Sequence, residues 1–176
     1  ESQGGKCVFT SEWDDFAQKT YRDNFGEGHP IAGDITQVDA KLIPDHDVLL
    51  AGFPCQPFSA GGKRQGFLDT RGTLFFEIER ILRQKKPYGF ILENVEGLVK
   101  HDLENKNDKI GRTLKTILHT LENDLGYKTS WKVFDSLEFG LPQSRKRIFI
   151  VGTKDEKIDL TGNEPRFKAL ESVLEK

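Results

Sequence analysis

A continuous apolar run passes directly into a proline-flanked loop at residues 47–59, DVLLAGFPCQPFS. Such an apolar run is typical of a strand that is buried on both of its faces. Residues 52–72 contain several Gly, two Pro and little apolar periodicity, which predicts a long loop. Cys55 is therefore expected on a stiff turn at the end of a buried strand.

Strand and helix patterns alternate on both sides of this stretch. Further strands are predicted over residues 6–11, 89–92, 127–134 and 147–153, and helices over residues 14–25, 73–83 and 110–125. Residues 33–36 resemble the end of a strand, and the charged residues 101–109 are typical of solvated surface or of the start of a mobile loop. The alternation predicts an α/β fold with a mostly parallel sheet, helices on both faces and right-handed crossovers.

The composition is that of an ordinary globular domain. The 176 residues include 26 Lys and Arg against 28 Asp and Glu, which gives a net charge of −2. This balance excludes a protein that grips nucleic acid through bulk positive charge, but not a local basic patch. No apolar run approaches the roughly 20 residues of a membrane span, and no signal peptide opens the chain, so we expect no membrane partner and a cytoplasmic location.

The cysteines and histidines indicate neither a disulfide framework nor a metal site. Cys7 and Cys55 lie far apart in the sequence, and the four His share no ligand-like spacing with them. The chain also begins at Glu1 and contains no Met, so we expect an internal or trimmed piece of a longer protein.

Polar or reactive residues follow several of the predicted strands. Parallel sheets bind ligands at the carboxyl ends of their strands. Four residue pairs are expected at that edge: Glu12–Trp13, Asp34–Ile35, Pro54–Cys55 and Glu93–Asn94.

Three segments carry candidate chemistry, each with a plainer alternative. Cys55 is either a nucleophile or a small buried hydrophobe. Glu93 ends an apolar strand, where burial would raise the pKa of its carboxyl group and make it a proton donor; the alternative is a helix N-cap. Gln143, Arg145 and Arg147 alternate and share one face of an extended backbone, unless they are only the charged start of an ordinary strand.

Together these segments resemble the C5-cytosine DNA methyltransferases, which transfer a methyl group from S-adenosylmethionine to carbon 5 of cytosine. The matching motifs, in family order, are EWDDFAQKTYRDNF at 12–25, GDIT at 33–36, PCQPFS at 54–59, ENV at 93–95 and QSRKR at 143–147. The resemblance implies a Rossmann-like methyltransferase fold.

The resemblance also implies a covalent mechanism on a cytosine that is flipped out of the duplex. Cys55 would attack carbon 6, and Glu93 would stabilise the charge that develops at ring N3. Arg147 would hold the base O2, and Arg145 would contact the substrate backbone and the cysteine loop. The Gly-rich loop at residues 60–72 would act as the lid.

The implied binding residues fall into two groups. Those for S-adenosylmethionine are Glu12, Trp13, Asp34, Ile35, Pro54 and Leu74. For Leu74, an ordinary place in the hydrophobic core is an equally good interpretation. Those for the substrate are Gln56, Ser59, Asn94 and Gln143.

The chain departs from the family at both ends. The opening strand with its DLFAGxGG loop, which cradles the cofactor, is missing, as is the target-recognition region. We therefore expect residues 1–176 to be a partial catalytic domain of a bacterial-type enzyme that acts on double-stranded DNA and is a monomer when complete. The alternatives are a tRNA cytosine methyltransferase of the related branch and a non-catalytic regulatory module. The target sequence and any restriction partner cannot be read from these residues.

Overall fold

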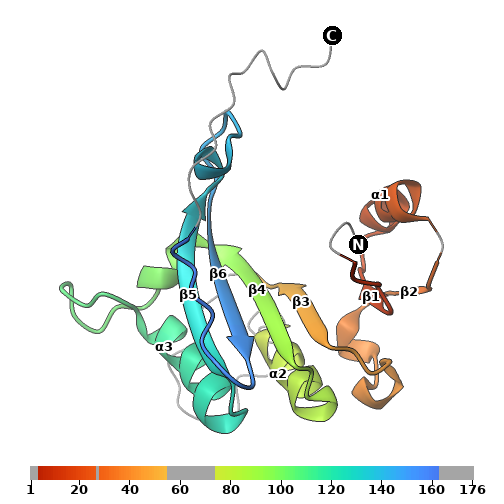
Figure 1. Cartoon of the computed structure of the whole chain (residues 1–176), viewed down its shortest axis with the longest axis horizontal. Helices are drawn as coiled ribbons and strands as arrows, with labels where there is room; N and C mark the ends of the chain where they lie inside the picture. The colour runs from red at the N-terminus through yellow and green to blue at the C-terminus, as the bar shows by residue number, and fades with distance from the viewer. Residues whose placement is uncertain (1–3, 27, 55–73, 163–176) are drawn as a thin grey trace.

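The computed structural model describes residues 4–26, 28–54 and 74–162 (Figure 1). The strands in these residues are β1 (Thr10–Ser11), β2 (Ile31–Ala32), β3 (Val48–Gly52), β4 (Gly89–Val95), β5 (Lys128–Asp135) and β6 (Lys146–Thr153). The α-helices are α1 (Asp15–Phe25), α2 (Leu74–Lys85) and α3 (Arg112–His119). Short helical turns are η1 (Ile35–Gln37), η2 (Ala40–Leu42), η3 (Glu96–Lys100), η4 (Thr120–Asp124) and η5 (Ser136–Phe139).

The main sheet has four strands in the order β3-β4-β6-β5. β3 and β4 are parallel, whereas β6 is antiparallel to both of its neighbours. The predicted α/β class is confirmed: β3, β4 and β5 run in the same direction, and among the described strands of this sheet β6 alone runs against them. The reason is the connection between β5 and β6, residues 136–145, which is shorter than the dozen or more residues that a parallel crossover needs.

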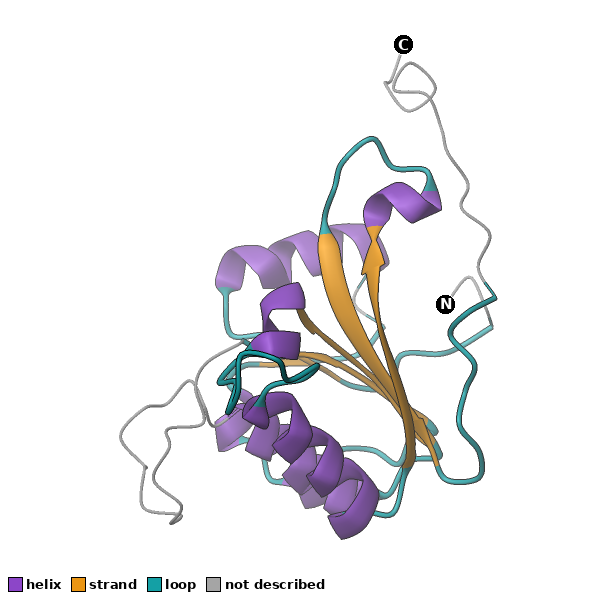
Figure 2. Ribbon diagram, turned by 90° about the vertical axis from the view of Figure 1, so that its left-hand side faces the viewer, coloured by secondary structure: helices purple, strands orange, loops and turns teal. Residues whose placement is uncertain are grey.

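The core lies between this sheet and helices α2 and α3, which cover the same face (Figure 2). On β4 the alternate residues Phe90 and Leu92 are fully buried, as the period of a strand requires. α2 presents Phe75, Ile78, Ile81 and Leu82 to them. On the other face of the sheet Leu50 is 72% exposed. Helices were predicted on both faces of the sheet. Within the described residues, the helices that cover the sheet, α2 and α3, lie on the same face.

β1 and β2 form a separate parallel pair that lies beyond β3 in Figure 1, on the side away from β4. The predicted helix that follows β1 is confirmed as α1. The side chain of its N-cap, Asp14, accepts a hydrogen bond from the Ala17 amide at 2.8 Å. The predicted strand end at residues 33–36 is displaced, because Asp34 caps the turn η1 instead.

The predicted helix at residues 110–125 changes character along its length. α3 gives way at Thr120 to the π-helical turn η4, and the chain leaves it through Gly126, which has a φ of 77°. Leu114, Ile117 and Leu121 remain fully buried across this change. The apolar stripe that predicted the helix therefore packs against the sheet as expected.

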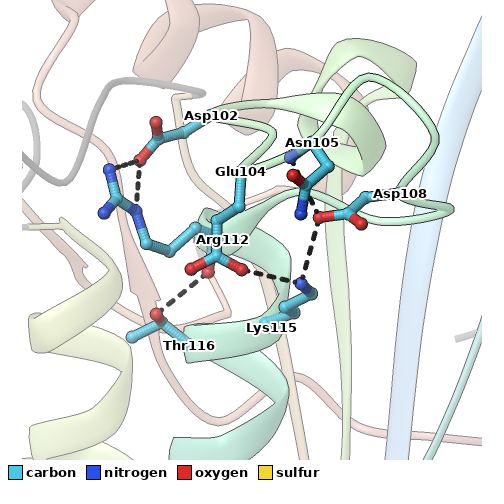
Figure 3. A network of polar contacts seen from close by, with 7 residues as sticks. All are labelled: Asp102, Glu104, Asn105, Asp108, Arg112, Lys115 and Thr116. Atoms are coloured by element: carbon cyan, nitrogen blue, oxygen red, sulfur yellow. Dashed lines mark hydrogen bonds and ion pairs between the residues drawn. The ribbon is translucent and has the colours of Figure 1, made fainter.

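The charged segment before α3 is held in place by ion pairs (Figure 3). Arg112 contacts Asp102 at 2.8 Å, and Lys115 contacts Glu104 at 3.0 Å and Asp108 at 3.5 Å. The hydrogen bond to Glu104 raises the pKa of the Lys115 ammonium group. The segment is solvated surface, as predicted, and its acidic residues Asp102, Glu104 and Asp108 are paired with cations of α3.

Among the helices of residues 4–26, 28–54 and 74–162, none is long and apolar enough to cross a bilayer.

Candidate active site

The ends of three strands meet at one edge of the main sheet. β3 and β4 run in the same direction, so their carboxyl ends meet there, with Gly52 paired to Glu93. β6 runs the other way, so its first residues reach the same edge, and Arg147 pairs with Val95. The antiparallel strand thus brings the QSRKR segment to the end of the ENV strand.

Glu93 and Arg147 form an ion pair at this edge. Arg147 Nε lies 2.8 Å from Glu93 Oε1, and a second guanidinium nitrogen donates to the Lys146 carbonyl oxygen at 2.8 Å. The side chains are 39% exposed for Glu93 and 24% exposed for Arg147. The expected burial of the Glu93 carboxylate is therefore only partial. The pair places an acid and a guanidinium side by side, within reach of one small ligand.

Asn94 points to the opposite face of β4 and is 2% exposed. Its Nδ2 donates to the carbonyl oxygen of Phe53 at 2.8 Å, and its Oδ1 accepts from the Val95 amide at 2.8 Å. The side chain thus ties the end of β4 to the residue that follows β3. A substrate contact of Asn94 stays a prediction, because both of these hydrogen bonds are to the protein backbone.

An open groove of about 560 Å³ lies beside the ion pair. Residues 95–97 form one wall and residues 143–147 the other. Arg145 and Gln143 are exposed on the second wall, and Lys146 lies 3.7 Å from Glu96 across the groove. Arg145, Lys146 and Arg147 make this groove a local basic patch. The net charge of the chain did not exclude such a patch.

The expectations for Cys55, Gln56 and Ser59 fall outside the described residues. Pro54, the last described residue before them, is exposed and lies two residues beyond Gly52. The loop that carries the predicted nucleophile thus leaves the sheet where Gly52 pairs with Glu93.

Four of the six predicted cofactor residues lie after the ends of β1 and β2. These two strands are parallel, so Glu12–Trp13 and Asp34–Ile35 leave them at the same edge. The Trp13 side chain is 78% exposed, and Asp34 is exposed with its Oδ1 accepting from the Thr36 amide at 2.9 Å. The half-buried Ile35 packs against the core. The carboxylate of Glu12 is half-buried and that of Asp34 is exposed, and both lie near the exposed indole. Their binding of an adenosine stays a prediction.

Leu74 opens α2 and packs against the core as a partly buried side chain. Its predicted cofactor contact remains a prediction.

Two residues near the edge were not picked out from the sequence. A Cβ added at Gly52 would lie 3.3 Å from Glu93 Oε2, so this glycine leaves room for the carboxylate. Asp135 ends β5 and forms a capping box with Glu138. The spacing of Asp135 and Glu138 is a sequence signal for a helix start that could have drawn attention to this loop.

The chain belongs to the C-5 cytosine-specific DNA methylase family, whose sequence model matches residues 1–175. It is 54% identical over 175 residues to the Type II methyltransferase M.NlaIV of Neisseria lactamica, covering 99% of this chain and 41% of that protein. It is 52% identical over 177 residues to M.HaeII of Haemophilus aegyptius, covering 99% of this chain and 52% of that protein.

Solved structures show the same fold. A DNMT2 mutant from Spodoptera frugiperda matches with a TM-score of 0.72 and 24% identity, over 98% of this chain and 53% of that one. The Dnmt2 methyltransferase of S. pombe matches with a TM-score of 0.69 and 19% identity, over 99% of this chain and 52% of that one. The chain thus spans about half the length of the relatives it matches.

Proposed function

We propose that the full-length protein methylates carbon 5 of cytosine in double-stranded DNA, with S-adenosylmethionine as the methyl donor. The Glu93–Arg147 ion pair carries this proposal, because it lies where the cysteine-bearing loop leaves β3. Membership of the C-5 cytosine-specific DNA methylase family supports it. So do the bacterial relatives, which are named Type II methyltransferases.

In this proposal the chemistry proceeds through a covalent bond to the base. Cys55, as thiolate, bonds to carbon 6 while Glu93 holds a proton at ring N3, so that carbon 5 becomes nucleophilic. Arg147 donates to the base O2 and holds Glu93 in place. After carbon 5 has gained its methyl group it gives up its proton to a base from solvent, the electron pair of that C–H bond re-forms the carbon 5–carbon 6 double bond, and the carbon 6–sulfur bond breaks to release the Cys55 thiolate.

The adenosine part of the cofactor would lie at the ends of β1 and β2. Glu12 would accept hydrogen bonds from the ribose hydroxyls, Trp13 would stack on the adenine and Asp34 would accept from its amino group. Ile35, Pro54 and Leu74 would contribute apolar contacts. When bound, S-adenosylmethionine supplies an electrophilic methyl group.

The DNA would be held in the groove of residues 95–97 and 143–147. A base stacked in the duplex is out of reach, so the target cytosine is flipped out, and Arg145, Gln143, Gln56 and Ser59 support it there. Asn94 would act on the substrate only through the backbone of Phe53 and Val95, to which its side chain is hydrogen bonded. In this proposal residues 1–176 belong to the catalytic domain of a cytoplasmic enzyme that works as a monomer. Recognition of the target sequence belongs to a separate domain.

Methyl transfer to defined nucleic acids tests the proposal. The full-length protein is incubated with methyl-labelled S-adenosylmethionine and either duplex DNA or tRNA, and the products are digested to nucleosides. Labelled 5-methylcytosine from DNA is the expected result. Label in tRNA alone would favour the tRNA enzyme, and cofactor binding without any transfer would favour a regulatory module.

Replacing Gly52 by Ala is expected to lower methyl transfer about tenfold without unfolding the protein. The new Cβ would lie 3.3 Å from Glu93 Oε2, so the carboxylate must move by a few tenths of an ångström. Small misplacements of reacting groups are costly, about 100-fold for 1 Å. Steady-state rates and thermal melting measure the two effects. Gly162→Ala is the control, because its Cβ would meet nothing within 4 Å; equal rates in the two variants would contradict the prediction.

A further inference from the structure

The last residue of β5, Asp135, is hydrogen bonded to the loop that carries the predicted substrate residues. Its Oδ2 accepts from Ser144 Oγ at 2.7 Å. Its Oδ1 accepts from the Arg145 amide at 3.0 Å and from the Leu137 amide at 3.2 Å. One carboxylate therefore joins the beginning of the loop to its end, immediately before Arg145.

Ser136 strengthens the same connection. Its hydroxyl donates to the carbonyl oxygen of Gln143, and its amide donates to the carbonyl oxygen of Arg145 at 3.3 Å. Between these contacts the chain turns through Gly140, which has a φ of 82°. Residues 143–145 are thus held from the Asp135–Ser136 side at three successive positions, through the backbone of Gln143 and Arg145 and the hydroxyl of Ser144.

The charge of Asp135 suits this role. The hydrogen bond from Ser144, followed by those from the Leu137 and Arg145 amides, lowers the pKa of the Asp135 carboxyl group. The group is ionised at neutral pH, and hydrogen bonds to an ionised acceptor are stronger than those to a neutral one. The side-chain hydrogen bonds of Asp135 go to Ser144, Arg145 and Leu137, so its influence on the groove passes through this loop.

We propose that Asp135 is a positioning residue, which aligns the backbone of Ser144 and Arg145 so that the Arg145 side chain meets the DNA substrate. The inference rests on the proposed function, because it concerns the substrate side of the same groove. It assigns Asp135 a role in DNA binding that goes beyond capping η5. Capping requires the Leu137 and Glu138 contacts, whereas alignment requires those to Ser144 and Arg145.

The test compares three variants of the full-length protein. Asp135→Ala removes every acceptor, whereas Asp135→Asn keeps one carbonyl oxygen for the Arg145 amide and an amide group for Ser144 Oγ. Asp159→Ala is a matched control: Asp159 also accepts from a backbone amide and a hydroxyl, at 2.8 and 2.6 Å from Thr161, and its pKa is also lowered. It follows β6 and lies beside Lys132 of β5, and its own hydrogen bonds go to Thr161 rather than to residues 143–147.

Asp135→Ala is expected to lower kcat/KM for duplex DNA between about tenfold and 100-fold, mainly by raising KM. Its affinity for S-adenosylmethionine, measured by calorimetry, should stay unchanged, because the predicted cofactor residues lie on other strands. The kcat/KM of Asp135→Asn should lie within about threefold of the wild-type value. The kcat/KM of Asp159→Ala should equal the wild-type value.

Equal KM values in Asp135→Ala and Asp159→Ala would overturn the inference. So would a failure of Asp135→Asn to recover while its melting temperature equals that of the wild type. If all variants melt early and lose cofactor affinity together, Asp135 is structural and the inference is wrong. A wild-type protein that transfers no methyl group to DNA would instead reject the proposed function, and the inference with it.

Discussion

Replacing Cys55 by Ser is expected to abolish the covalent adduct with DNA that contains 5-fluorocytosine, and to lower methyl transfer about 1000-fold or more. A serine hydroxyl is a far weaker nucleophile than a thiolate, so the bond to carbon 6 no longer forms. With fluorine at carbon 5 there is no proton to remove, so the wild-type adduct stays trapped. Denaturing electrophoresis of the full-length protein with labelled DNA measures it directly.

The chain offers a matched control in its other cysteine. Cys7 lies in the segment before β1, where its Sγ is 3.4 Å from His29 Nε2. Cys7→Ser should therefore form the adduct as the wild type does. An undiminished adduct in Cys55→Ser, or its loss in Cys7→Ser alone, would show that the nucleophile has been assigned to the wrong residue.

Replacing Glu93 by Gln is expected to lower the rate of methyl transfer by about 100-fold to 10,000-fold, the usual contribution of a general acid or base. Gln keeps the shape of the side chain and a carbonyl oxygen for the Arg147 guanidinium, which lies 2.8 Å from the carboxylate. It cannot offer an ionisable proton to ring N3. Single-turnover rates at saturating DNA separate this loss from weaker binding.

Glu122→Gln is the control for this second prediction. Glu122 is 37% exposed, close to the 39% of Glu93, and lies 3.6 Å from Lys157. Its partner Thr129 pairs with Gly152, near the other end of the sheet. Rates in Glu122→Gln should stay near those of the wild type. A Glu93→Gln variant that retains more than a tenth of the wild-type rate would remove Glu93 from the chemistry.

Local sequence patterns predicted most elements of this fold. The apolar run before the cysteine loop is β3, and the run before Glu93 is β4. Their burial differs from the expectation, since Leu50 is largely exposed on the face of the sheet opposite α2 and α3. Hydrophobic periodicity reports which residues are apolar, but not which face of a sheet a helix will cover.

The candidate site divides in the same way. The motifs around Cys55, Glu93 and Arg147 were recognisable in the sequence, and the family they predict is confirmed. The hydrogen bonds of Asn94 and Asp135 could not be predicted from the sequence. Asn94 bonds to a residue that follows a different strand, and Asp135 bonds to the other end of its loop. Gly52 was read only as loop composition, since its closeness to Glu93 depends on the pairing of β3 with β4.

The order of the amino acids was enough to predict most of the elements, the family and the residue types that carry the chemistry. The contact between Glu93 and Arg147 depends on how the strands pair. In a fully parallel sheet the start of β6 would lie at the edge opposite the end of β4, and the two side chains would be separated by the length of the strand. The short connection after β5 forces β6 to run antiparallel, and this reversal brings Arg147 to within 2.8 Å of Glu93.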